Sequence, residues 1–125
     1  MHATELRNQL AQFTGSSTFT RHALIPRMLM TEGVVYLARA ASARWLTDAI
    51  GSYLLDKRAP QEPFQAWRLV VDTQSRHAVL IMTDGNGPEP IITQQIDYTD
   101  FALDQIDLWL VADSEHWVLM LPTEY

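Results

Sequence analysis

Five strand-like segments between residues 64 and 121 constrain the fold of this chain more than any other feature. They read FQAWRLVVD, HAVLIMTD, PIITQQID, IDLWLVAD and HWVLMLP, and they are rich in the branched, aromatic and aliphatic residues that favour strands. The breaks TQS and DGNGPE are too short to hold a crossover helix, so neighbouring segments are expected to pair as antiparallel hairpins. HWVLMLP is apolar on both faces and predicts a central strand, whereas PIITQQID alternates and predicts a peripheral one.

The N-terminal half adds helices to this pattern. An apolar stripe predicts a short helix over residues 4–13, and ASARWLTDAIGSYLLD restores the helical period, with Ser42 as a candidate N-cap. Between them, FTRHALI, RMLMT and VVYLA are strand-like, with a turn before VVYLA. The predicted fold class is α+β: a mostly antiparallel, curved sheet with one major helix packed on it and a short N-terminal helix.

Size and composition favour a single α+β domain over residues 1–125. The chain is 47% hydrophobic and 19% charged, which is ordinary for one packed core. It has no cysteine, so disulfides and thiolate metal sites are excluded. The sequence shows no leader pattern and no run near the roughly 18 apolar residues of a membrane span, and a cytoplasmic protein is therefore expected.

Charge is distributed unevenly along the chain. From His77 to Tyr125 there are nine of the 15 acidic residues and none of the 9 Lys and Arg residues. Direct binding to nucleic acid is not expected, because phosphate contacts need clustered basic side chains. A basic protein surface is the favoured partner, and the alternative is an acidic surface that only keeps the protein soluble.

The acidic C-terminal half contains the ladder IDYTDFALDQID, whose aspartates are spaced by three, four and three. Residues 106–113 alternate like a strand, so the ladder is not one helical face, and Asp100 is expected to cap a turn. Trp109 shares a strand face with Asp107, and an aromatic residue beside acidic ones suits a protein interface, unless the sheet is covered on both faces. The candidate partner-binding residues are Asp97, Asp100, Asp104, Asp107 and Trp109.

Motifs for catalysis or cofactor binding are absent from the sequence. DGNG does not continue as an EF-hand loop and is interpreted as a hairpin turn. No GxSxG, GxxxxGK[ST] or GxGxxG pattern occurs. No catalytic, cofactor-binding or metal-binding residue is therefore predicted, and no close ligand pair occurs among the four histidines, which are His2, His22, His77 and His116.

Several phrases, LAQFTGS, ARWLTDAI, EPFQAW, TDGNG, IDYTDF and LPTEY, resemble a family of small uncharacterised bacterial proteins known only as a domain of unknown function. The resemblance spans nearly the whole chain and implies no activity. It implies occurrence on bacterial mobile elements. The residues that carry the resemblance are Thr14-Gly15, Asp84-Gly85, Tyr98 to Phe101 and Glu124-Tyr125. The sequence departs from the family pattern at two positions, since Glu32 stands where Asp is more usual and Ala102 stands where Pro is expected.

Three hypotheses follow. The first is a non-catalytic protein-binding domain whose acidic half engages a basic, nucleic-acid-binding protein, in its concrete form an inhibitor of a bacterial defence complex comparable to an anti-CRISPR protein. The second is a small enzyme or ligand-binding protein with a pocket between helix and sheet. The third is a homodimeric structural module formed through exposed strand edges. No membrane partner is expected in any of them.

Overall fold

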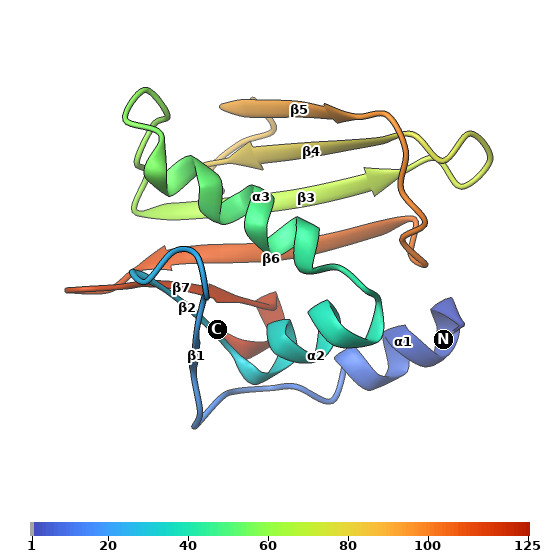
Figure 1. Ribbon diagram of the computed structural model, residues 1–125, viewed down its shortest axis with the longest axis horizontal. Coiled ribbons are helices and arrows are strands. Elements are labelled where there is room, and N and C mark those ends of the chain that lie inside the picture. Colours follow the sequence, from blue (N-terminus) through green and yellow to red (C-terminus); the bar gives the residue numbers. More distant parts are fainter. Residues whose placement is uncertain (1) are drawn as a thin grey trace.

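The computed structural model, which describes residues 2–125, is built around a seven-stranded sheet. Figure 1 shows how the helices and strands are arranged. The strand order is β1-β2-β7-β6-β3-β4-β5, and every neighbouring pair is antiparallel except β2 and β7. The strands are β1 (Thr20–Arg21), β2 (Met28–Met30), β3 (Phe64–Val71), β4 (Ala78–Thr83), β5 (Ile92–Ile96), β6 (Gln105–Ala112) and β7 (Trp117–Met120).

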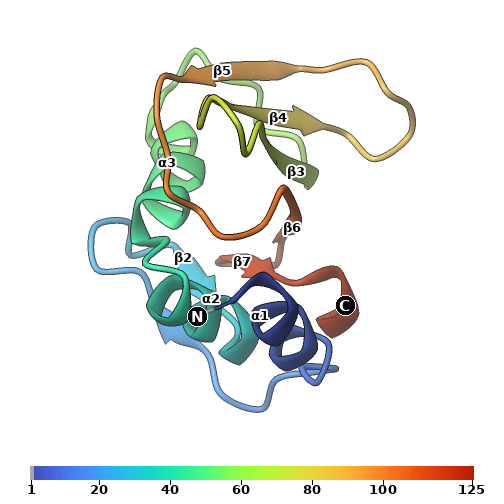
Figure 2. The ribbon, with the colours of Figure 1, turned by 90° about the vertical axis from the view of Figure 1, so that its right-hand side faces the viewer.

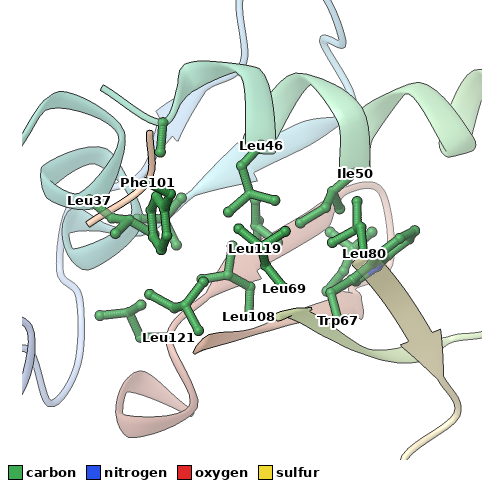
Figure 3. Packing of buried hydrophobic residues seen from close by; sticks show 14 of the residues in the cluster. Leu37, Leu46, Ile50, Trp67, Leu69, Leu80, Phe101, Leu108, Leu119 and Leu121 are labelled. Atoms are coloured by element: carbon green, nitrogen blue, oxygen red, sulfur yellow. The ribbon is translucent and has the colours of Figure 1, made fainter. Parts of the chain in front are cut away.

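Three α-helices pack against the sheet in residues 2–125. They are α1 (Ala3–Leu10), α2 (Glu32–Ala40) and α3 (Arg44–Leu55), and a 3-10 turn, η1 (Pro122–Glu124), follows the last strand. Helix α3 crosses β3 and β6, and the view turned by 90° places it to one side of them (Figure 2). The core fills the space between helices and sheet, with Leu46 and Ile50 facing Leu69, Leu80 and Trp67 (Figure 3).

The predicted antiparallel hairpins are confirmed. All five predicted strands in residues 64–120 form, and β4 pairs with both β3 and β5. Strand β7 lies inside the sheet and β5 lies at its edge, as their apolar patterns predicted. Strand β6 pairs with β3, so the connection over residues 97–104 crosses from one edge of the β3–β4–β5 unit to the other.

The prediction of one major helix is wrong, because VVYLA is part of helix α2 rather than a strand. Its apolar residues Val34, Leu37 and Ala38 are spaced by three and one, which places them on one buried helical face. Thr31 caps this helix, since its hydroxyl accepts a hydrogen bond from the Val34 amide, and the Glu124 carboxylate contributes from the far end of the chain. The strand propensity of VVYLA is therefore overridden by the contact between Glu124 and the start of α2.

Three details of the structure also differ from the sequence-based prediction. Helix α1 ends at Leu10, and FTRHALI contributes only the two residues of β1. Ser42 does not cap α3, because it adopts a left-handed conformation (φ 51°) in the reversal that follows α2. In that reversal the Ala43 amide donates to the Ala38 carbonyl at 2.9 Å, which closes the end of α2.

Candidate interaction surface

The sheet face opposite helix α3, called the open face below, is formed by alternate residues of the central strands (Figure 2). In β6, Ile106, Leu108 and Leu110 are buried, while Asp107 and Trp109 between them are partly exposed. The same alternation holds in β3 and β4, which face the helices with one set of side chains and solvent with the other. The open face consists mainly of Phe64, Ala66, Arg68, Val70, Val79, Ile81, Thr83, Asp107, Trp109 and Val111.

An aromatic cluster lies on this face. The ring of Trp109 is 5.2 Å from that of Phe64 and 5.4 Å from that of Tyr125, both edge-on, and Tyr125 is 76% exposed. Gly85 allows the hairpin to pass over Phe64: its φ of +84° suits glycine, and a Cβ there would lie 2.8 Å from Phe64 Cε1. Edge-to-face rings with exposed surface are typical of interface anchors.

Beside this cluster is a hollow of about 400 Å³. An ion pair between Arg68 Nε and Asp107 Oδ1, 2.7 Å apart, lies in it, and the hydrogen bond to Asp107 raises the pKa of Arg68. Trp109 and Ile81 provide apolar walls, and Pro88 of the β4–β5 hairpin lines it too. The hollow thus combines an aromatic wall with an ion pair. Because exposed ion pairs contribute only about 0–1 kcal/mol to stability, Asp107 can pair with a charged group of another molecule with little loss of stability.

The five sequence-predicted residues fall into two groups. Asp107 and Trp109 lie on the open face, on the same strand face as predicted. Asp97, Asp100 and Asp104 are exposed in the β5–β6 connection, where the Asp104 carboxylate accepts a hydrogen bond from the Arg7 guanidinium of α1 at 3.0 Å. The predicted turn cap is corrected: the Thr99 hydroxyl, not Asp100, accepts the hydrogen bond from the Phe101 amide.

Two members of the aromatic cluster, Phe64 and Tyr125, were not predicted from the sequence. Phe64 reads as an ordinary strand residue, and its place opposite Val111 depends on the β3–β6 register. Tyr125 reaches Trp109 only because η1 turns the chain end back toward β6. The alternation that places Trp109 on the open face places Phe64 there too, so knowledge of the β3–β6 pairing would have identified that residue.

Arg76 fixes the connection that carries the other aspartates. Its guanidinium donates to the carbonyls of Thr99 and Phe101 at 2.8 and 2.7 Å, and the Thr99 amide donates back to the Arg76 carbonyl. Arg76 itself has a left-handed backbone (φ 66°) in the β3–β4 turn, where Asp72 accepts hydrogen bonds from the amides of Gln74 and Ser75. The turn and the acidic connection are therefore one hydrogen-bonded unit.

The hydrogen bonds of Asp72 in the β3–β4 turn predict that the stability of the fold depends on pH. The amide hydrogen bonds from Gln74 and then Ser75 hold the pKa of Asp72 below its usual 3.8. A carboxyl group with a lowered pKa stabilises the fold above its unfolded-state pKa, and this contribution is lost as the pH falls through the folded-state pKa. We expect Asp72→Asn to lower the urea midpoint at pH 7 and to differ less from wild type at pH 3.

The matched control is Asp97→Asn, because Asp97 is exposed and its carboxylate forms no hydrogen bond in residues 2–125. It should leave the urea midpoint unchanged at both pH values. An equal loss at pH 7 and pH 3 for Asp72→Asn would show that the ionised carboxylate is not what stabilises the turn.

Two further groups have pKa values that are shifted by neighbouring residues or by burial. The backbone and then the side chain of Arg58 lower the pKa of Asp56, and burial raises the pKa of Tyr53, with a smaller contribution from Asp56. Within residues 2–125, no three His, Asp or Glu side chains gather as a metal site, and each buried side-chain polar atom has a hydrogen-bond partner. No helix in the same range has the length and apolarity needed to cross a membrane.

Known proteins resemble this chain in fold and in sequence. A solved structure described as a protein of unknown function from Enterococcus faecalis is similar, with a TM-score of 0.58 and 14% identity over 86% of this chain and 98% of that one; at this identity the likeness concerns the fold alone. No curated protein matches the sequence. The pattern of a family of unknown function, DUF6876, matches residues 4–125. This chain therefore belongs to the DUF6876 family.

Proposed function

We propose that this chain is a non-catalytic protein-binding domain that uses the open face of its sheet to bind a basic surface on a partner protein. The observation that carries the proposal is the cluster of Phe64, Trp109 and Tyr125 on the open face, in which Tyr125 is exposed and the other two rings are partly exposed. Three rings in contact offer a large, rigid apolar area that loses little conformational entropy on binding, as interface anchors do.

Charge favours a basic partner. Strands β4 to β7 and their connections contain no Lys or Arg, and Arg68, which lies in the hollow, is already paired with Asp107. The hairpin that borders the hollow adds Asp84 and Glu89. An arginine of the partner can stack on the Trp109 ring and pair with Asp107, and both interactions are ones that guanidinium groups make readily.

A nucleic-acid-binding protein is one form of such a partner, because its binding site is rich in Lys and Arg. An acidic domain that covers this site would compete with the nucleic acid. The sequence-based hypothesis of an inhibitor that acts on a bacterial defence complex is thus a narrower version of the proposal. The charge of the C-terminal half and the implied mobile-element setting support it.

The test is capture of a partner from a bacterial lysate by immobilised wild type and by Trp109→Ser, at low and high salt. We expect wild type to retain a protein with a basic surface that is released by salt, because exposed charges are screened. Loss of an aromatic anchor typically costs about 2 kcal/mol or more of binding energy, so Trp109→Ser should retain at least about 30-fold less.

Tyr98→Ser is the matched control, since Tyr98 is 69% exposed and belongs to the β5–β6 connection rather than to the open face. It should capture the partner as wild type does. Retention by Trp109→Ser together with loss by Tyr98→Ser would move the interface to the acidic connection. Self-association of wild type that Trp109→Ser abolishes would instead support the homodimer hypothesis.

A further inference from the structure

A second hollow lies on the other side of the molecule, between the β1–β2 segment and helices α2 and α3. Its volume is about 360 Å³, within the range of small-molecule sites. Met30, Val35, Ala38 and Leu24 supply apolar walls, and Leu24 is 70% exposed at its rim. The hollow shares no residue with the open face.

Three arginines, Arg21, Arg39 and Arg44, line this hollow and are exposed. None of them forms an ion pair in residues 2–125, although the chain pairs Arg7, Arg58 and Arg68 with aspartates elsewhere. Like charges around one hollow repel one another, and an anion would relieve that repulsion. Guanidinium groups bind carboxylate, phosphate and sulfonate oxygens through paired N–H donors.

The single carboxylate that lines the hollow is already engaged. Asp48 Oδ1 lies 2.7 Å from Nε2 of His22, which is buried. Nδ1 of His22 accepts hydrogen bonds from the amides of Leu24 and Ile25 at 3.1 and 3.2 Å, so Nδ1 carries no proton and Nε2 is the donor to Asp48. Both ring nitrogens are therefore occupied, and His22 holds the wall of the hollow rather than acting as a base.

We infer that this hollow binds a small molecule made of an oxyanion group and an apolar body. The three arginines bind the oxyanion, and the apolar walls beneath them hold the body. The inference does not depend on the proposed function, because the two sites have different residues and a different charge.

The test uses 8-anilinonaphthalene-1-sulfonate as the probe, with fluorescence titration of the full chain, and N-phenyl-1-naphthylamine as the matching neutral probe. We expect one saturable sulfonate site. Arg39→Gln and Arg44→Gln should each weaken it by at least about ten-fold, since a charge-assisted hydrogen bond is lost. The neutral probe should bind more weakly and should not respond to either substitution.

Arg27→Gln is the matched control: it removes the same charge from a nearby exposed arginine that does not line the hollow. It and Trp109→Ser should leave the probe affinity within about two-fold of wild type. Equal weakening by Arg27→Gln, a loss that follows Trp109→Ser, or no saturable binding would each overturn the inference.

Competition then identifies the oxyanion. Phenyl phosphate and benzoate share an apolar ring and differ in the charged group. Displacement of the bound sulfonate probe by either one supports the site and assigns its head-group preference. Failure of both to displace the probe at millimolar concentration would contradict a general oxyanion site.

Discussion

Glu124→Ala should lower the free energy of unfolding by about 3 kcal/mol, because it leaves several buried donors without an acceptor. Glu124 is 9% exposed. Its carboxylate accepts hydrogen bonds from the hydroxyls of Thr31 and Ser16, at 2.6 and 2.9 Å, and from the amides of Gly33 and Leu121, both at 3.0 Å. It also places a negative charge at the N-terminus of α2, which the helix dipole favours. Urea denaturation would measure the loss.

Two further variants distinguish the effect of the Glu124 carboxylate from the effect of its side-chain volume. Glu124→Gln keeps the shape but turns an NH₂ group toward donors, so it should still lose about half of that free energy or more. Gly33→Ala should also destabilise, because a Cβ there would lie 2.6 Å from Glu124 Oε1, which the Thr31 hydroxyl and the Leu121 amide hold in place. A Glu124→Ala loss below about 0.5 kcal/mol, the level of ordinary surface changes, would contradict this role.

Phe101→Ala should cost about 3–5 kcal/mol, the usual loss when a buried aromatic ring is removed from a core. Phe101 is fully buried and lies beside Leu37 of α2 (Figure 3). It is the anchor by which the β5–β6 connection, with Asp97 and Asp100, closes the end of the core. The expected result is a lower urea midpoint with an unchanged denaturant slope.

The control for this substitution is Phe19→Ala, since Phe19 is 47% exposed and lies outside the core cluster. It should change the free energy of unfolding by less than about 0.5 kcal/mol. Similar losses for the two phenylalanines would mean that the connection does not pack as described.

The sheet was predictable from the sequence because the residue patterns that indicate its strands and turns are local. Alternation and turn residues such as Asp84-Gly85 define each strand within a few positions, and short breaks leave antiparallel pairing as the simple solution. Helix α2 was not predictable in the same way, because β-branched residues such as Val34 favour strands locally. Its start is stabilised by Glu124, 91 residues or more away in sequence, and no local pattern contains that contact.

The candidate site was predictable in part for a similar reason. Strand alternation placed Asp107 and Trp109 on one face, and this is confirmed. The neighbours of Trp109 follow from strand pairing and from the turn at the chain end, so Phe64 and Tyr125 were missed. Charge counting identified the acidic half of the chain but not the ion pairs of Asp104 and Asp107, which depend on Arg7 and Arg68 from distant segments.

Photo-crosslinking from the open face tests the central claim most directly. Val70 is 40% exposed on that face, and Tyr98 is 69% exposed in the β5–β6 connection. With p-benzoylphenylalanine in place of each residue in turn, irradiation in a bacterial lysate should give an adduct to a protein with a basic surface from position 70 and none from position 98. An adduct from position 98 alone, or none from either position, would contradict binding through the open face.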